Sequence, residues 1–273
     1  MKKVLTALLL ISLLFALCAC GGTGGHVSAE SFMSRAKVNS LVKRYGEKPQ
    51  AELTLSYTSS GDEVVVKVVY DLLLEQAPLA VTRFIQIANE GGYEGTLADT
   101  LNKDHDYIVM GRYKKFDDDN YYYDVRGGQT TFAGEFKQND YKQPKGGYAT
   151  FGMFSLAMYH ANDGAQFDAA NGTLILSLTS DEKKVLNSAN YAVFAQLASI
   201  SVKVGKGELV DYRKVPSFVR ENLYGFSARV TRKVYDRYDD TKGYVSVQMM
   251  STAVKLHVEM LGNHDWSKLP KIG

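Results

Sequence analysis

The sequence predicts a mainly β fold in which about eight antiparallel strands close into a barrel. The runs 51–58 and 64–70 carry alternating or β-branched apolar residues on either side of turn residues 59–62, which indicates a β-hairpin. Paired glycines at 127–128 and 146–147 mark tight turns between further short apolar strands. An antiparallel sheet of about this size closes with an interior that side chains can fill, so a barrel is expected.

One helix is predicted directly after the hairpin. Pro78 suits the first turn of a helix, and the apolar residues after it are spaced to share one face as far as Gly91–Gly92. That face comprises Val81, Phe84, Ile85 and Ala88.

A second helical segment is predicted within the charged region 205–243, as an insertion near the C-terminus. It begins at Pro216–Ser217, and its apolar positions are Phe218, Leu223, Val230 and Val234. The other short strands are expected at 107–110, 154–158, 173–178, from 191 onward, and over 244–261.

Composition limits the classes of function. The chain has 273 residues, of which 45% are hydrophobic and 23% charged, as suits one globular domain with extra segments. Its formal net charge of +2 argues against a nucleic-acid-binding protein, which carries a strong basic excess. Neither the scattered histidines nor the acidic run 114–124 has metal-ligand spacing, so we expect no metal and no cofactor.

The N-terminus has the pattern of a targeting segment. Lys2–Lys3 precedes an apolar run, Val4–Leu17, which has the length of a secretory signal sequence. The small residue before Cys20 resembles a bacterial lipobox, whereas Cys18 follows a leucine. We therefore expect residues 1–20 to be a lipoprotein signal peptide and the protein to be extracytoplasmic, lipid-anchored to the bacterial cell membrane through Cys20. A plain secretory signal or a single membrane anchor is the alternative.

The stretch from Gly127 to Phe167 combines features that suit an extended peptide. The strand 154–158 contains a small residue that leaves space above it, while Gln166 offers an amide and Phe167 an aromatic ring. Judged on these local residues alone, an antiparallel strand pair packing its own core is the favoured interpretation.

Six segments in the correct order resemble the cyclophilin-type peptidyl-prolyl cis–trans isomerases. They are 74–84, 92–96, 127–136, 155–157, 165–167 and 190–194. The resemblance covers residues 50–265, with 21–49 as a tether or linker and 266–273 as a tail. It implies a closed eight-stranded antiparallel barrel capped by two helices, and isomerisation of X-Pro bonds in proline-containing extended peptides or unfolded exported proteins. The barrier to that rotation is ~18–20 kcal/mol.

The resemblance also assigns site residues. The implied substrate-binding positions are Tyr107, Met110, Ala157, Met158, Gln166, Leu186 and Tyr191. The position of the family's catalytic arginine holds Thr100, which brings a hydroxyl but no charge. Since losing one preorganised donor typically costs ~2.7–4 kcal/mol at the transition state, we expect weak isomerase activity.

Arg112, two residues beyond Met110, is a candidate substitute for the missing arginine if the strand continues with both on one face. An exposed or salt-bridged arginine is the alternative, and the favoured, interpretation of that residue. The alternative function is a catalytically inactive cyclophilin-like lipoprotein that binds a peptide or a partner.

Overall fold

The computed structural model describes the greater part of the chain after the N-terminal segment. The described residues are 32–115, 120–123, 132–135, 141–142, 148–160, 170–181, 186, 191–208, 213–236, 241 and 243–272. Cys20 with its signal segment, the tether glycines, the paired glycines at 127–128 and 146–147, and Gln166 lie outside these residues.

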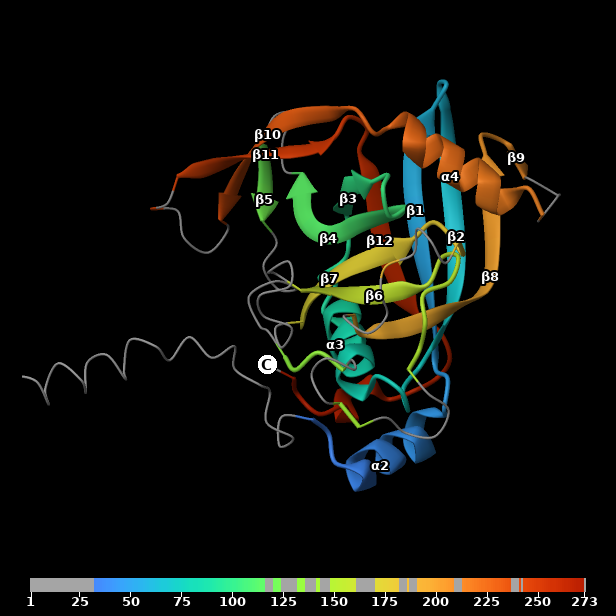
Figure 1. Cartoon of the computed structure of the whole chain (residues 1–273), viewed down its shortest axis with the longest axis vertical. Helices are drawn as coiled ribbons and strands as arrows, with labels where there is room; N and C mark the ends of the chain where they lie inside the picture. The colour runs from blue at the N-terminus through green and yellow to red at the C-terminus, as the bar shows by residue number, and fades with distance from the viewer. Residues whose placement is uncertain are drawn as a thin grey trace, which may run out of the picture.

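Eight strands form a closed ring of antiparallel pairings (Figure 1). They are β1 (Gln50–Ser59), β2 (Asp62–Leu72), β3 (Thr96–Asn102), β4 (Tyr107–Lys115), β6 (Leu156–His160), β7 (Ala170–Ser177), β8 (Val193–Val204) and β12 (Val254–Met260). Their order is β4-β3-β12-β1-β2-β8-β6-β7, and β7 pairs back onto β4. The predicted mainly β fold with eight ringed antiparallel strands is thereby confirmed.

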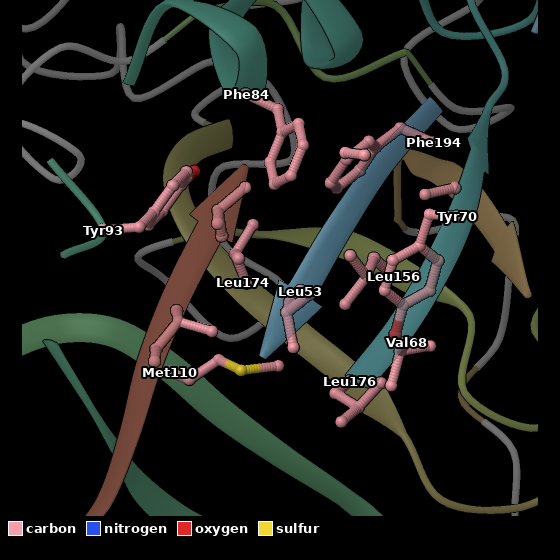
Figure 2. Close-up of a cluster of buried hydrophobic side chains, with 14 of the residues drawn as sticks. Leu53, Val68, Tyr70, Phe84, Tyr93, Met110, Leu156, Leu174, Leu176 and Phe194 are labelled. Carbon is pink, nitrogen blue, oxygen red and sulfur yellow. The ribbon is translucent and has the colours of Figure 1, made fainter. Parts of the chain in front are cut away.

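The ring is built around a single large core. Along β1 and β2, alternate residues such as Leu53, Leu55 and Val68 are fully buried, as the period of two requires. Helix α3 (Pro78–Asn89) contributes Phe84, whose ring centroid lies 5.1 Å from that of Phe194 on β8. Figure 2 shows the two phenylalanine side chains facing the leucines inside the ring of strands.

The loop 132–135 holds the N-terminus of α3. The N-cap residue Ala77 has no side chain that can accept a hydrogen bond, and the carboxyl group of Glu135 takes over this role. The backbone N–H of Leu79 donates to Oε1 at 2.9 Å, and that of Ala80 donates to Oε2 at 3.0 Å. Burial raises the pKa of Glu135 from 4.5 to about 8, although the two N–H donors lower it.

Helix α2 (Arg35–Tyr45) packs on the same domain at the end where α3 lies (Figure 1). Leu41 and Tyr45 belong to the main core, and Tyr45 stacks on Trp266 in the short 3-10 helix η5 (Trp266–Lys268), with 4.9 Å between ring centroids. In the described part of the chain, no helix has the length and apolar character needed to cross a membrane.

Helix α4 (Val215–Gly225) is the described helix of the predicted insertion. It presents Val219 and Leu223 to the main core. The prediction that Val230 and Val234 continue a helix was wrong, because both lie on strand β10 (Arg229–Asp236). A spacing of four places residues on one side of a strand as well as one side of a helix, so the spacing alone did not distinguish the two.

Three strands extend the sheet beyond β4 and are called the extension here. They are β5 (Asn120–Tyr123), β10 and β11 (Tyr244–Met250), where β10 runs parallel to β5 and antiparallel to β11. A small two-residue strand, β9 (Gly207–Glu208), pairs with β8 elsewhere. The extension curls over β3 and β4 and encloses a second, smaller core made of Leu97, Tyr113, Tyr121, Val234 and Met249.

Candidate functional site

The outer surface of β4, β6, β7 and β8 carries a separate apolar cluster, which we call the outer cluster. Its buried members are Phe151, Ala157, Ile175 and Val193, and its partly buried members are Tyr107, Ala149, Tyr159, Leu186 and Tyr191. Successive residues of a strand point to opposite faces, so these side chains lie outside the ring while their neighbours fill its interior.

Four of the residues assigned to substrate binding meet in this cluster. Tyr107, Ala157, Leu186 and Tyr191 come from β4, β6 and the segments that precede β8, and they are far apart in the sequence. Tyr191 also packs edge-on against the ring of Phe151, with 5.7 Å between the centroids. The cluster therefore has a floor of small and branched residues and a rim of tyrosines.

Two other assigned residues face the opposite way. Met110 and Met158 are 0% exposed and belong to the main core inside the ring. Met158 is one residue from Ala157, and Met110 is three residues from Tyr107, which both lie in the outer cluster. Because successive side chains of a strand point to opposite faces, the two methionines point inward. Neither reaches the outer cluster in this structure.

Paired irregularities in β3 and β4 bring two charged side chains together. Ala98 pairs with Met110 and Thr100 with Val109, so Asp99 is an extra residue on β3. On β4, Leu97 pairs with Tyr113, which leaves Gly111 and Arg112 as extra residues.

Gly111 makes the second irregularity possible. Its φ of +87° is a conformation that residues with a side chain rarely adopt, and an added Cβ would lie 3.2 Å from the ring of Tyr93. The bulge turns Arg112 outward although Met110 faces inward, so the expectation that both share one face was wrong.

The guanidinium of Arg112 is hydrogen-bonded to two residues of strand β3. Its Nε donates to Asp99 Oδ2 at 3.1 Å, and one terminal nitrogen donates to both Asp99 Oδ1 and Thr100 Oγ1. Thr100 in turn donates to Asp99 at 2.7 Å. The two residues assigned to the catalytic position thus lie in one hydrogen-bonded group, with Asp99 at its centre.

The same guanidinium overlies the rim of the outer cluster. Its central carbon lies 5.4 Å from the ring centroid of Tyr159 and 5.2 Å from that of Tyr113. Burial lowers the pKa of Arg112, but the adjacent carboxylate of Asp99 outweighs it and raises the pKa overall, so the residue remains a cation. Burial raises the pKa of Asp99, opposed by Arg112.

This arrangement offers an aromatic rim beside one oriented cation. Among the described residues, no group of three or more His, Cys, Asp or Glu side chains is placed to hold a metal ion.

Sequence reasoning missed Asp99, although it lies in the run 97–101 where only position 100 was considered. The available signal was a carboxylate next to Thr100 within an otherwise uncharged strand segment.

Comparison with known proteins returned matches among solved structures alone. No family model matches the chain, and no curated protein does. A cyclophilin-type peptidyl-prolyl cis–trans isomerase from Cryptosporidium parvum matches with a TM-score of 0.41 and 12% identity, covering 79% of this chain and 99% of its own.

Two further structures belong to the same class. The Cryptosporidium protein in the presence of the dipeptide Ala-Pro matches with a TM-score of 0.40 and 12% identity, over 77% of this chain and 99% of its own. The Mimivirus cyclophilin matches with a TM-score of 0.40 and 14% identity, over 83% of this chain and 95% of its own. These three structures are cyclophilins.

Proposed function

We propose that the outer cluster binds extended, proline-containing segments of proteins and that the chain is a weak peptidyl-prolyl cis–trans isomerase. The observation that carries the proposal is the position of Arg112, an outward-facing cation over the Tyr159 ring at the rim of an apolar surface. A proline ring is apolar, so it can pack on the outer cluster. Its nitrogen accepts a hydrogen bond when the amide twists, so it can accept one from Arg112.

The chemistry requires no covalent step. The rim tyrosines receive the proline ring, and Arg112 donates an N–H to the prolyl nitrogen as the amide loses its planarity. Because that nitrogen accepts only in the twisted state, the bond favours the transition state over the planar substrate. Nε and one terminal nitrogen are engaged by Asp99 and Thr100, which leaves the other terminal nitrogen to make this contact.

The ion pair also limits the activity. Asp99 is almost fully buried beside the guanidinium and offsets its charge. An arginine whose charge is offset in this way stabilises a twisted amide less than an unpaired one. We therefore expect a rate enhancement well below that of an isomerase with an unpaired catalytic arginine.

The test is the isomerisation rate of a proline tetrapeptide, measured by NMR exchange so that no coupling protease is needed. The wild-type chain should exceed the uncatalysed rate, and Arg112→Gln should reduce the enhancement at least tenfold. Arg112→Lys, which keeps a cation beside Asp99 but lacks the forked geometry, should retain an intermediate rate. Arg44→Gln, an exposed arginine on α2, is the matched control.

The second candidate function is a catalytically inactive module that binds a peptide or partner on the same surface. The engagement of Arg112 by Asp99 is the observation that favours it. Saturable binding of the tetrapeptide without any rate enhancement would select this function and exclude the isomerase.

We also propose that the protein acts outside the cytoplasm, anchored by acyl chains on Cys20. The support is the sequence pattern alone: a basic start, an apolar run, and a small residue before the cysteine. Metabolic labelling with palmitate should mark the wild-type chain and leave Cys20→Ala unlabelled. Labelling that persists in Cys20→Ala would contradict the anchor.

A further inference from the structure

Strand β11 is the open edge of the sheet. It ends the strand order and pairs only with β10 among the strands of the described chain. Natural proteins usually protect such an edge with charged residues, proline or a bulge, because its unpaired N–H and C=O groups can pair with another strand. The sequence of β11, YVSVQMM, contains no charged residue and no proline.

The outer half of β11 is also apolar and exposed. Tyr244 is 51% exposed and Val245 is 62% exposed, and in the described part of the chain they are the large hydrophobic residues most open to solvent. The ribbon of β10 and β11 projects sideways beyond the ring (Figure 1). An edge strand with exposed apolar side chains on both faces is suited to adding a further strand.

The described strands at this edge carry more basic than acidic residues. Strand β10 carries Arg229, Arg232 and Lys233 against one acidic residue, Asp236, while β5 and β11 carry no charge. Lys233 lies over the ring of Tyr244, with 4.9 Å from its Nζ to the ring centroid. A segment that pairs with β11 therefore passes beside several cations.

A cavity of about 140 Å³ opens at the inner end of β11. It lies between β3 and the loop 251–253, and its lining includes Lys115, Arg232, Tyr121 and Met249. The Arg232 guanidinium, beside an aromatic ring and a polar loop, is a suitable receptor for a carboxylate.

From these observations we propose that β11 and this cavity form a docking site for an extended acidic segment of a partner protein. The segment adds to the sheet as a new edge strand, and one of its Asp or Glu side chains enters the cavity near Arg232. Main-chain pairing supplies affinity, and the cations select acidic sequences. A second copy of this chain is a poorer occupant, because its own β11 has no acidic side chain to meet the cations of the first copy.

The probe is a fluorescent ten-residue peptide in which glutamate alternates with valine and threonine. A peptide of the same pattern with lysine in place of glutamate is the charge control. The full chain should bind the acidic peptide at least tenfold more tightly than the lysine peptide in fluorescence anisotropy, with affinity falling as salt rises. Hydrogen–deuterium exchange should slow over residues 244–250 when the acidic peptide binds.

Substitutions at the β11 edge and in the cavity test separately how much each contributes to peptide binding. Val245→Asp, at an exposed position, should weaken binding at least tenfold by placing a negative charge on the pairing edge. Arg232→Gln should weaken binding severalfold and reduce the preference for glutamate over lysine. Lys203→Gln, an exposed lysine on β8, should change affinity less than twofold.

Three outcomes would overturn the proposal: equal affinity for the two peptides, exchange that stays unchanged over 244–250, or Val245→Asp that binds like wild type. Dimers in sedimentation that Val245→Asp abolishes would assign the edge to a second copy and also overturn it. The inference is independent of the outer cluster, so Arg112→Gln should bind the acidic peptide like wild type whatever the isomerase assay shows.

Discussion

The ring and the extension are two β structures that differ in completeness. Every strand of the ring has a partner on each side, and its interior is filled by a continuous core. Among the described residues, the extension encloses five buried core residues, and its last strand is β11. We expect the ring to supply most of the stability of the domain, whereas β11 of the extension has a neighbour on one side only among the described strands.

The largest expected effect concerns Glu135, which joins a loop to helix α3 of the ring domain. Its folded-state pKa of about 8 lies above its unfolded value of 4.5, because burial disfavours the carboxylate. The folded state therefore keeps a proton that the unfolded state loses, and the free energy of unfolding falls as pH rises from about 4.5 to about 8. At ~1.4 kcal/mol for each pKa unit, the loss has an upper bound of about 5 kcal/mol.

Urea denaturation from pH 5 to pH 8.5 checks this. Wild type should lose stability across the window, and Glu135→Gln should remove most of that dependence while losing one hydrogen bond to α3 at every pH. Glu63→Gln, at an exposed position on β2, should keep the wild-type slope. Parallel curves for wild type and Glu135→Gln would show that Glu135 does not retain its proton.

Next in size is removal of a ring-core side chain. Phe84 is fully buried between α3 and β8, so Phe84→Ala should destabilise the whole domain by about 3–5 kcal/mol. Chemical denaturation followed by the fluorescence of Trp266, which packs on α2 at the same end, provides the measurement. The milder Phe84→Leu should lower stability by a smaller amount, and a loss below 1 kcal/mol for Phe84→Ala would contradict the role of this core.

A smaller and more local effect is expected in the extension. Val234→Ala removes two methyl groups from the second core, at ~0.8 kcal/mol each by the usual transfer value. Hydrogen exchange should quicken over residues 229–236 and 244–250 and remain unchanged in β1 and β2. Faster exchange throughout the ring would show that the two β structures unfold as one unit, which would contradict the distinction between the ring and the extension.

Much of the ring was predictable from the sequence because its signals are local. Alternating runs, turn residues and the Pro78 start defined β1, β2 and α3 directly. The sequence resemblance had assigned Tyr107, Ala157, Leu186 and Tyr191 to one binding surface, and these four residues lie in one cluster.

Other features depend on geometry that the sequence pattern does not carry. Met110 and Met158 were assigned to the site, but strand alternation turns them into the main core. The outward direction of Arg112 depends on the bulge at Gly111, where two residues of β4 have no partner on β3 and the regular alternation of faces is interrupted. Strand β10 was taken for helix because Val230 and Val234 fit both periods.

The most direct test of the proposed site is an NMR titration of the labelled chain with a proline tetrapeptide. We expect shifts to concentrate on Tyr107, Tyr159, Leu186 and Tyr191, together with the Nε–H of Arg112, and to leave β11 unchanged. The matched peptide with alanine in place of proline should produce much weaker shifts. Shifts confined to β11, or none at saturating peptide, would contradict a proline-binding site on the outer cluster.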